Sequence, residues 1–436
     1  LENQSPLTFE IMQNNQQAPK GFHRLTIEER LDQIASMTEL GQDEIQCLKK
    51  FGNLPEETAN GMVENVIGVM GIPFGVATNL ILDGKEMLVP MATEESSVIA
   101  AVCNASKQCR SSGGVTSSVS GSEMIAQIQL LGLSNPHYAR QVLLEKKEKI
   151  RELCDAIDPL LLENGGGFRD LEVRILETRG GTMVILHLIV DTQDAMGANA
   201  VNSMAESLAP KIEEWTGGRV NLRILSNLAD RRLARARAVW NLEDLGGEQV
   251  RDDMLAASWF AEADPYRAAT HNKGIMNGVS AVALVTGNDT RALEAGAHAY
   301  ASRSGQYTSL SRWETDGTGN LVGSLEMPMA VGLIGGATRV HPIAKIALKI
   351  LGVNKAEDLA RVMAAVGLVQ NYGALKALAT TGIQKGHMAL HSKNVAMMAG
   401  AVGDEVDLLA KRLVEIGKIR TDAAEEELAK IRNWKN

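Results

Sequence analysis

"LEVRILETRGGTMVILHLIVD", residues 171–191, predicts two β-strands joined by a tight turn. Apolar and polar residues alternate over Leu171–Thr178, which is the pattern of a strand with one buried face. Thr182–Asp191 is almost continuously apolar, as expected of a strand inside a sheet. Between them, Gly180 and Gly181 allow the positive backbone angles of a short hairpin turn. This hairpin is the centre of the predicted fold.

The segments on either side of the hairpin extend it to a β-α-β-β-α-β order. Before it come a strand-like stretch, Met124–Leu133, and one charged helix over about residues 139–153. After it come an amphipathic helix, Ala198–Trp215, and an alternating strand, Arg219–Asn227. This order is the ferredoxin-like arrangement. It occupies residues 115–227, in the middle of the chain, so we expect an inserted small domain.

The remainder of the chain predicts a larger helix-rich domain, which makes the fold class α+β. Residues 1–114 would form an N-terminal arm and the first part of this domain, and residues 228–380 its second part. In the second part we expect first an Arg-rich helix, then Gly- and Ala-rich helices with short apolar strands such as "SAVALVTGN" (280–288). We place Lys273 of "RAATHNKGIMNG" (267–278) in a loop. Residues 381–436 end in two helices with acidic first turns and predict a small C-terminal helical unit.

Composition argues against several classes of protein. The chain has 436 residues, 45% hydrophobic and 22% charged, so it is globular. A net charge of −9 and only 4% aromatic residues argue against a nucleic-acid partner. No apolar stretch reaches about 18 residues, so no membrane-spanning helix is expected. The polar N-terminus does not resemble a signal peptide. Four cysteines without CxxC spacing indicate free thiols and a cytoplasmic location.

Two adjacent carboxylates, Glu94 and Glu95, interrupt the apolar stretch "LVPMATEESSVIAAV" (88–102). A buried carboxylate without a partner is costly and tends to take up a proton. One interpretation is that one glutamate faces solvent while the other is paired. The alternative is that one of them is kept protonated for acid chemistry. The local pattern does not decide between the two.

Three further stretches carry polar side chains that suit chemistry. In "DAMGANAVN" (194–202), Gly197 precedes a predicted helix whose free N–H groups attract phosphate, although a plain turn capped by Asp194 also fits. Lys273 lies in the predicted loop and could stabilise developing negative charge, or could be a surface residue. Asp289 follows an apolar stretch at a helix start, where it could be a simple N-cap.

The stretch "GHMALH" (386–391) places His387 and His391 one helical turn apart. This spacing raises the question of a metal site. The zinc-protease motif requires Glu after the first histidine, and here Met388 follows it. We therefore expect no metal, and a single histidine of this pair acting as a proton donor is the better interpretation, because histidine titrates near neutral pH.

Taken together, these stretches resemble the class II 3-hydroxy-3-methylglutaryl-coenzyme A (HMG-CoA) reductases, the bacterial and archaeal form without a membrane anchor. The resemblance extends from about Ala59 to the C-terminus, and its motifs occur in the family's order. They are ENVIG (64–68), LVPMATEES (88–96), DAMGAN (194–199), RILSNLAD (223–230), DPYRAATHNKGIMNG (264–278), TGND (286–289) and GHMALH (386–391). One departure is Ser96, where the family pattern has proline.

The resemblance implies a reaction and four catalytic residues. HMG-CoA would be converted to mevalonate and coenzyme A, or the reverse, by two successive hydride transfers involving NAD(P)H. Glu95 would be the general acid and Lys273 would stabilise the oxyanion. Asp289 would tune both, and His387 would protonate the coenzyme A thiolate. Glu94 matches no catalytic position.

The resemblance also implies ligand contacts and an assembly. The large domain would bind the HMG group through Ser97, Arg267 and Asn277, and the C-terminal unit would be a flap that carries the catalytic histidine. The small domain would bind the nicotinamide cofactor through residues of several motifs: Asp158, Asp194, Met196, Gly197, Asn199 and Asn227. Active sites would form across the interface of a homodimer, or of a higher assembly of dimers, with ENVIG in that region. Neither nucleic acid nor a membrane is an expected partner.

Asp158 bears on the choice of cofactor. It precedes Pro159, which suits an N-cap before a new helical turn. It also matches the position where NAD-preferring members carry an acid, which bonds the ribose 2′-hydroxyl of NAD and repels the 2′-phosphate of NADP. We therefore expect NADH to be preferred, with NADPH possible.

Two other functions stay open at this point. One is a different coenzyme A thioester enzyme on the same scaffold, such as a transferase. The other is a non-catalytic assembly protein, which the presence of all four matched catalytic residues disfavours.

Overall fold

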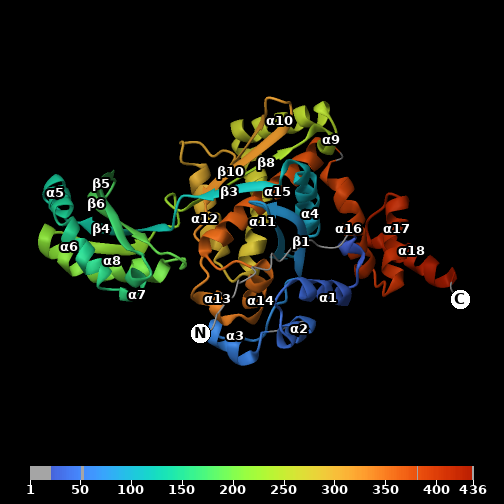
Figure 1. Ribbon diagram of the computed structural model, residues 1–436, viewed down its shortest axis with the longest axis horizontal. Helices are drawn as coiled ribbons and strands as arrows, with labels where there is room; N and C mark the ends of the chain where they lie inside the picture. Colours follow the sequence, from blue (N-terminus) through green and yellow to red (C-terminus); the bar gives the residue numbers. More distant parts are fainter. Residues whose placement is uncertain (1–20, 51–53, 381, 435–436) are drawn as a thin grey trace, which may run out of the picture.

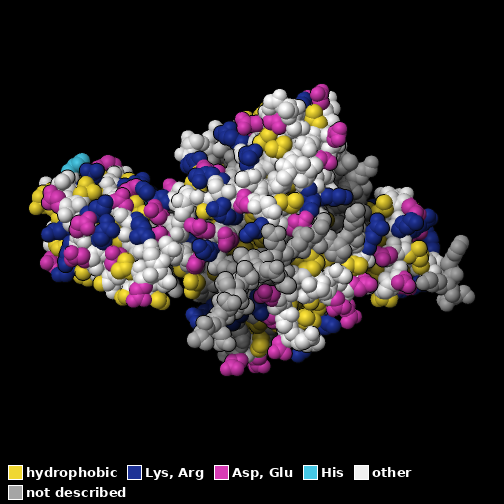
Figure 2. Space-filling view, in the orientation of Figure 1, with side chains coloured by type: hydrophobic (Ala, Val, Ile, Leu, Met, Phe, Trp, Pro, Cys, Tyr) yellow, Lys and Arg dark blue, Asp and Glu magenta, His cyan; other side chains and the backbone are white. Residues whose placement is uncertain are grey.

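The computed structural model describes residues 21–50, 54–380 and 382–434. Figure 1 shows a central part with a large sheet, flanked on one side by a small α/β part and on the other by C-terminal helices. The predicted N-terminal arm, residues 1–20, lies outside the described residues. Figure 2 shows basic and acidic side chains interspersed over the visible face of the small part.

The large sheet brings together strands that are distant in sequence. Among the described residues its order is β2-β1-β3-β8-β10-β9. The bounds are β1 Phe74–Leu82, β2 Lys85–Ala92, β3 Val115–Val119, β8 Leu233–Trp240, β9 Ser311–Thr315 and β10 Leu321–Pro328. β3 pairs antiparallel with β8, with Val119 opposite Ala234. The chain therefore leaves the sheet along β3 and returns along the adjacent β8, and the small part is inserted between these two strands.

The two strands at the insertion correct the sequence analysis. β8 is a strand and not an Arg-rich helix, because its pattern has a period of two: Ala234, Ala236 and Ala238 are buried, whereas Arg235 and Arg237 alternate with them toward solvent. β3 belongs to the large sheet. Residues 115–119 therefore lie outside the small sheet, although the sequence analysis placed them in the inserted domain.

The small part contains a separate sheet with the order β5-β6-β4-β7 in the described residues. Its strands are β4 Glu123–Leu131, β5 Gly167–Thr178, β6 Gly181–Asp191 and β7 Arg219–Leu225. The predicted hairpin is β5-β6, with Thr178 opposite Gly181. All pairings are antiparallel. With the helices between the strands, this is the ferredoxin-like order that the sequence predicted.

Helices pack on the small sheet and enclose a core of their own. They are α5 Pro136–Glu145, α6 Lys147–Asp155, α7 Pro159–Glu163 and α8 Ala198–Thr216. The single charged helix predicted for residues 139–153 is two helices, which meet at Lys146.

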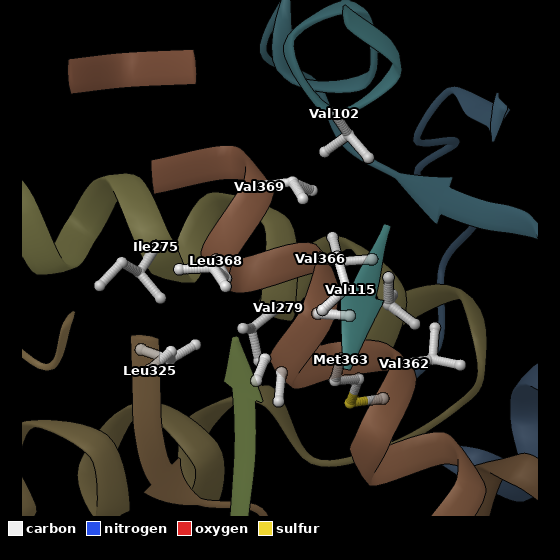
Figure 3. Packing of buried hydrophobic residues seen from close by; sticks show 14 of the residues in the cluster. Val102, Val115, Ile275, Val279, Leu325, Val362, Met363, Val366, Leu368 and Val369 are labelled. Carbon is white, nitrogen blue, oxygen red and sulfur yellow. The ribbon is translucent and has the colours of Figure 1, made fainter. Parts of the chain in front are cut away.

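Helices cover the large sheet and supply most of the central core. α15, Ala356–Ala379, packs on β3, β8 and β10, and α11, Pro265–Val285, packs against α15 and β2. Figure 3 shows Val366 of α15 surrounded by buried aliphatic side chains, which include Val279 of α11. α15 is long and apolar enough to span a membrane, but 67% of its most apolar window is buried inside the protein, as in a core helix.

The remaining elements of the central part are shorter. They are η1 Phe22–Arg24, α1 Ile27–Met37, α2 Gln42–Lys49, α3 Glu56–Met62, α4 Val98–Gln108, η2 Arg110–Ser112, α9 Leu242–Leu245, α10 Glu248–Ala263, α12 Thr290–Ala301, α13 Gly336–Val340 and α14 Pro342–Leu351.

α11 replaces the loop and the strand predicted for residues 267–288. It begins at Pro265, and Asp264 caps it by accepting hydrogen bonds from two backbone N–H groups of the first turn. Gly278 lies inside the helix because α15 is close: an added Cβ would be 3.0 Å from Val366 Cγ1. The glycine therefore serves helix–helix packing and does not mark a break in the helix.

The C-terminal part consists of α16 Ile383–Met398, α17 Asp404–Glu415 and α18 Thr421–Trp434. These helices enclose a small core that includes Val395, Leu409, Leu413 and Leu428. The α+β fold class, with a ferredoxin-like insertion and a C-terminal helical unit, is thereby confirmed.

Gly323 of β10 is expected to tolerate no side chain. It lies opposite Trp313 of β9, and an added Cβ would be 2.5 Å from the Trp313 ring. Trp313 is buried and donates its indole N–H to Asn371. Gly323→Ala should therefore lower the free energy of unfolding by about 1–3 kcal/mol, measured by guanidinium denaturation. Gly317→Ala is the control, because nothing lies within 4 Å of its added Cβ. Equal midpoints for the two variants would contradict this account of the packing.

Candidate active site

Glu95 and Lys273 form the centre of the candidate site. Lys273 Nζ donates a hydrogen bond to Glu95 Oε2 at 2.7 Å. Glu95 lies in the turn between β2 and α4, and Lys273 lies on α11, which packs against both of these elements. The side chains of Lys273 and Glu95 are 58% and 38% exposed, so the pair is accessible to a substrate.

The two adjacent glutamates have different environments, as the first interpretation predicts. Glu94 is exposed, whereas Glu95 is paired. The contact joins a carboxylate to an ammonium group, and such a contact strengthens when water is excluded. Glu95 as a protonated acid stays a prediction for a site that is closed around its substrate.

Ser97 is strained, and its hydroxyl group is unsatisfied. It precedes α4 with φ of 75°, a left-handed conformation that is uncommon outside glycine. The turn forms with Ser96 in place of the expected proline. Ser97 Oγ is buried without a hydrogen-bond partner among the described residues. An unpaired buried hydroxyl costs about 1–3 kcal/mol, and strained residues of this kind cluster at ligand sites.

Arg267 and Asn277 lie on α11 on either side of Lys273 in sequence. Both are half-buried, and burial lowers the pKa of Arg267. Within the described part of the chain, the Arg267 guanidinium forms no hydrogen bond or ion pair. A half-buried cation without a partner is suited to an anionic ligand such as a carboxylate. Asn277 is one helical turn from Lys273, on the same face of the helix.

Two buried residues that the sequence analysis assigned no role hold α11 in place. His271 Nε2 lies 2.8 Å from Ser311 Oγ, and burial, with Arg267 nearby, lowers the pKa of His271 to about 3. Asn272 donates to Tyr307 Oη and accepts from the backbone N–H of Leu310, both at 3.0 Å. These bonds fix the helix directly before Lys273. Their only signal in sequence was polar residues at adjacent helical positions.

Asp289 lies apart from the Glu95–Lys273 pair. It follows helix α11 rather than a strand, and it caps α12 by accepting from the backbone N–H groups of Arg291 and Ala292 at 3.0 and 3.1 Å. No ion pair joins it to Lys273 in the described structure. The preceding residue bonds to Ala283 O, and roughly 15 Å of helix separates Ala283 from Lys273. Within the described chain, Asp289 is therefore not close to Glu95 and Lys273.

The turn that leads into α8 has the properties of a phosphate site. Gly197 has φ of 99°, and an added Cβ would be 2.4 Å from Thr192 Cγ2, so only glycine fits there. α8 has neither a side-chain cap nor an acidic residue in its first turn. Its first N–H groups therefore remain available to an anion. A dinucleotide fits this donor set.

The other predicted cofactor residues of this region surround the turn. Asn199, in the first turn of α8, and Asn227 are exposed, and Met196 is half-buried. Asp194 does not cap α8. Its carboxylate accepts from the backbone N–H of Ala356 at the start of α15, at 2.7 Å, so it fastens the turn to the central part.

Gly332 joins this turn to the Asp289 turn. Its backbone N–H donates to Asn288 Oδ1 at 2.8 Å, and an added Cβ would lie 2.5 Å from the Met196 nitrogen. The next residue donates its N–H to Asp194 O. The candidate cofactor turn and the Asp289 turn therefore contact the same short segment. The sequence analysis missed Gly332, because a glycine distant in sequence carries no signal of this contact.

Asp158 acts as a helix cap in the structure. Its Oδ1 accepts from the backbone N–H of Leu161 at 3.0 Å, at the start of α7. The structural interpretation of this residue is therefore confirmed. A contact with the cofactor ribose stays a prediction.

His387 belongs to α16, but its side chain lies outside the described residues. In the described part of the chain, no three His, Cys, Asp or Glu side chains are grouped to hold a metal ion. The His387 side chain is outside that part, so the absence of a metal stays a prediction.

Comparisons with known proteins identify the family. The family model for hydroxymethylglutaryl-coenzyme A reductase matches residues 26–392. A 3-hydroxy-3-methylglutaryl-coenzyme A reductase from Archaeoglobus fulgidus is 55% identical over 413 residues, which are 95% of this chain and 94% of the relative. The chain belongs to the HMG-CoA reductase family. It is therefore an NAD(P)H-dependent oxidoreductase of the mevalonate pathway.

Solved structures confirm that it is of class II. An HMG-CoA reductase from Streptococcus pneumoniae matches with a TM-score of 0.81 and 38% identity, over 94% of this chain and 99% of that chain. A second Streptococcus pneumoniae structure, described as the class II reductase bound to NADPH in open conformations, matches with a TM-score of 0.80 and 38% identity over 83% and 99% of the two chains.

Ser97→Ala is expected to separate stability from activity. Removal of an unpaired buried hydroxyl should leave the melting temperature unchanged or raise it, since that group costs about 1–3 kcal/mol when it is unsatisfied. In contrast, kcat/KM for HMG-CoA should fall by about tenfold, the scale of one lost hydrogen bond to a charged group. Ser96→Ala is the matched control. Full activity in Ser97→Ala would show that the hydroxyl does not contact the substrate.

Proposed function

We propose that this reductase converts HMG-CoA to mevalonate and coenzyme A at the Glu95–Lys273 pair, with each residue in a distinct role. The observation that carries the proposal is the 2.7 Å contact between a solvent-accessible lysine and a glutamate, on a helix that also carries the unpartnered Arg267.

The substrate is held by groups that lack partners in the described structure. The Arg267 guanidinium binds the free carboxylate of the HMG group, because a carboxylate neutralises its half-buried charge. Ser97 Oγ and the Asn277 amide supply hydrogen bonds to the remaining oxygens. The thioester carbonyl is thereby placed next to Lys273.

The cofactor binds at the turn before α8. The first N–H groups of α8 and Gly197 receive its phosphates, with Met196, Asn199 and Asn227 beside them, while Asp194 holds the turn in place. When bound, the nicotinamide supplies the hydride for each reduction. Gly332 keeps this turn next to the Asp289 turn.

Lys273 and Glu95 act on the oxygen of the substrate. In the first reduction Lys273 Nζ stabilises the thioester oxyanion, and Glu95 gives it a proton to form the hemithioacetal. The hydroxyl proton returns to Glu95 as the C=O bond reforms and the C–S bond breaks. His387 protonates the departing sulfur. In the second reduction the same two residues stabilise and protonate the aldehyde oxygen, which gives the alcohol of mevalonate.

We also propose that the complete site requires a second copy of the chain. Asp289 does not reach Lys273 within the described chain, so an Asp289 beside the pair has to come from a symmetry-related subunit. The residues around ENVIG support such an interface. Val63, Ile67, Val69 and Met70 are 59%, 105%, 51% and 84% exposed, which is unusual for a run of large apolar residues.

We also propose that the enzyme is cytoplasmic and that it uses no metal ion. The four cysteines are free thiols, which supports a reducing compartment such as the cytoplasm. Lys273 provides the electrophilic group at the substrate oxygen, so the proposed mechanism includes no metal ion. A coenzyme A transferase on this scaffold is distinguished by NAD(P)H oxidation with HMG-CoA as the sole acyl substrate.

Lys273→Ala and Glu95→Gln should each reduce turnover of HMG-CoA by about 10²-fold or more, the usual scale for loss of an oxyanion donor or a proton donor. The assay follows NAD(P)H oxidation by absorbance. Glu94→Gln is the control, because Glu94 is exposed and has no assigned role. The assignment fails if either folded variant of the pair turns over at a rate close to wild type.

Co-expression of Lys273→Ala and Asp289→Asn chains separates the dimer from the catalytic assignment. If Asp289 comes from the partner, mixed dimers contain one intact site, and activity should recover to about a quarter of wild type for random pairing of two-fold dimers. Each variant alone should stay inactive. The absence of recovery, with both chains shown to associate, would place all the groups in one chain.

Asp158→Ala should narrow the preference for NADH over NADPH. The acid favours the 2′-hydroxyl of NADH and repels the 2′-phosphate of NADPH, so its removal weakens use of the first and improves use of the second. The measurement is kcat/KM for both cofactors in both proteins. A wild-type preference for NADPH, or an unchanged ratio in the variant, would leave Asp158 with only its role as a cap.

A further inference from the structure

We propose that Arg232, which no motif of the site includes, is a positioning residue for the dinucleotide. It holds the turn of residues 192–197 against the central part and places its charge behind that turn. The inference rests on the proposed function in one respect, namely that this turn receives the cofactor phosphates.

Arg232 is almost completely buried, with 4% of its surface exposed. Nη1 donates to Thr192 Oγ1 and Ala195 O, both at 2.9 Å, and to Met196 O at 3.3 Å. Nη2 donates to Gln193 O at 3.2 Å. One side chain therefore binds four oxygens of the same turn.

The other hydrogen bond from Nη2 joins this turn to the central part. It donates to Val331 O at 2.7 Å, next to Gly332, and the Arg232 carbonyl accepts from the backbone N–H of Met329. Arg232 itself lies directly before β8, where the chain returns from the small part. The guanidinium therefore bridges the inserted part and the central part at the point of insertion.

The chemistry of these contacts favours an anion on the opposite side of the turn. The described chain has no cis peptide bonds, and in a trans peptide the C=O and the following N–H point in opposite directions. Arg232 holds Met196 O and therefore directs the following N–H, that of Gly197, away from the guanidinium, whereas the Met196 nitrogen lies against Gly332. The N–H of Gly197, which follows Met196 O, belongs to the same turn as the uncapped start of α8.

Arg232 remains charged in this position. Burial lowers its pKa to about 10, and the nearby carboxylates of Asp191, Asp194 and Glu357 oppose that effect. The start of α8 has no side-chain cap. The buried positive charge of Arg232, behind the turn, therefore adds to the positive electrostatic potential of the α8 N-terminus. Arg232 thus contributes geometry and electrostatic potential without touching the ligand.

The adjacent Arg231 offers a matched control. It is partly exposed and forms ion pairs with Glu123 and Glu172, and it belongs to the mixed charged surface and not to the turn. Arg231→Lys keeps an exposed charge. Arg232→Lys keeps a buried charge but lacks the forked geometry needed to bind several carbonyl oxygens at once.

The test compares Arg232→Lys and Arg231→Lys in the full-length enzyme. In Arg232→Lys, KM for NADH and for NADPH should rise together by about tenfold, the scale of lost hydrogen bonds to a charged group. KM for HMG-CoA should stay within about twofold, since its contacts lie on α11 and near Ser97. NADH binding measured by fluorescence should weaken by the same factor. Arg231→Lys should change none of these values.

Thr192→Val provides a second variant in case Arg232→Lys folds poorly. With little change in size it removes one acceptor of Arg232, together with the hydroxyl's own bonds to Ser122 O and Ala195 O. It should raise KM for both cofactors in the same direction but by less. A variant that melts earlier with an unchanged KM for both cofactors would show a purely structural role and overturn the inference. Failure of wild-type protein to oxidise either cofactor with HMG-CoA would instead overturn the proposed function.

Discussion

The close approach of α11 and α15 is the constraint on which the candidate site depends. Each helix carries a glycine where the other presents a valine. An added Cβ at Gly278 of α11 would lie 3.0 Å from Val366, and one at Gly367 of α15 would lie 3.0 Å from Val279. Such reciprocal contacts leave no space for larger residues and exclude sliding of one helix along the other. Lys273 lies on the same helix as Gly278, five residues before it. The helix packing therefore fixes the position of Lys273 relative to the sheet.

Buried polar contacts set the rotation of α11 around its own axis. His271 and Asn272 both bond to the segment before and within β9, and they are adjacent to Lys273. The bonds of His271 Nε2 and of the Asn272 amide offset the cost of burying these groups, whereas His271 Nδ1 has no hydrogen-bond partner in the described structure. The same bonds therefore stabilise the fold and direct Lys273 toward Glu95. This coupling explains why a helix that contains charged, amide and glycine residues is stable in the middle of the protein.

The cofactor side of the site is assembled from segments that meet only in three dimensions. The β3–β8 pairing brings the two ends of the insertion together, and Asp194, Gly332 and Arg232 fasten the turn before α8 to the central part. The separation of Asp289 from Lys273 is the reason for proposing that a second chain completes the site.

Local periodicity determined much of the fold from the sequence alone. The alternation in β5, the apolar run of β6 and the helix patterns around them predicted the ferredoxin-like insertion, because these elements follow each other closely along the chain. Thr26 and Glu29 form a reciprocal capping box at the start of α1, a boundary that the local sequence specifies by itself. Family motifs indicated Glu95 and Lys273, and the structure brings these two side chains together.

Tertiary structure decided the features whose cause lies far away in the sequence. α11 resembled a loop because its glycines and polar residues have partners on α15, β9 and the segment before it, which no local window contains. β8 resembled an Arg-rich helix until its alternate alanines were seen to face the core. The unsatisfied hydroxyl of Ser97, the capping role of Asp289 and the five acceptors of Arg232 are properties of distances between atoms. The sequence specifies those distances only through the complete packing of the chain.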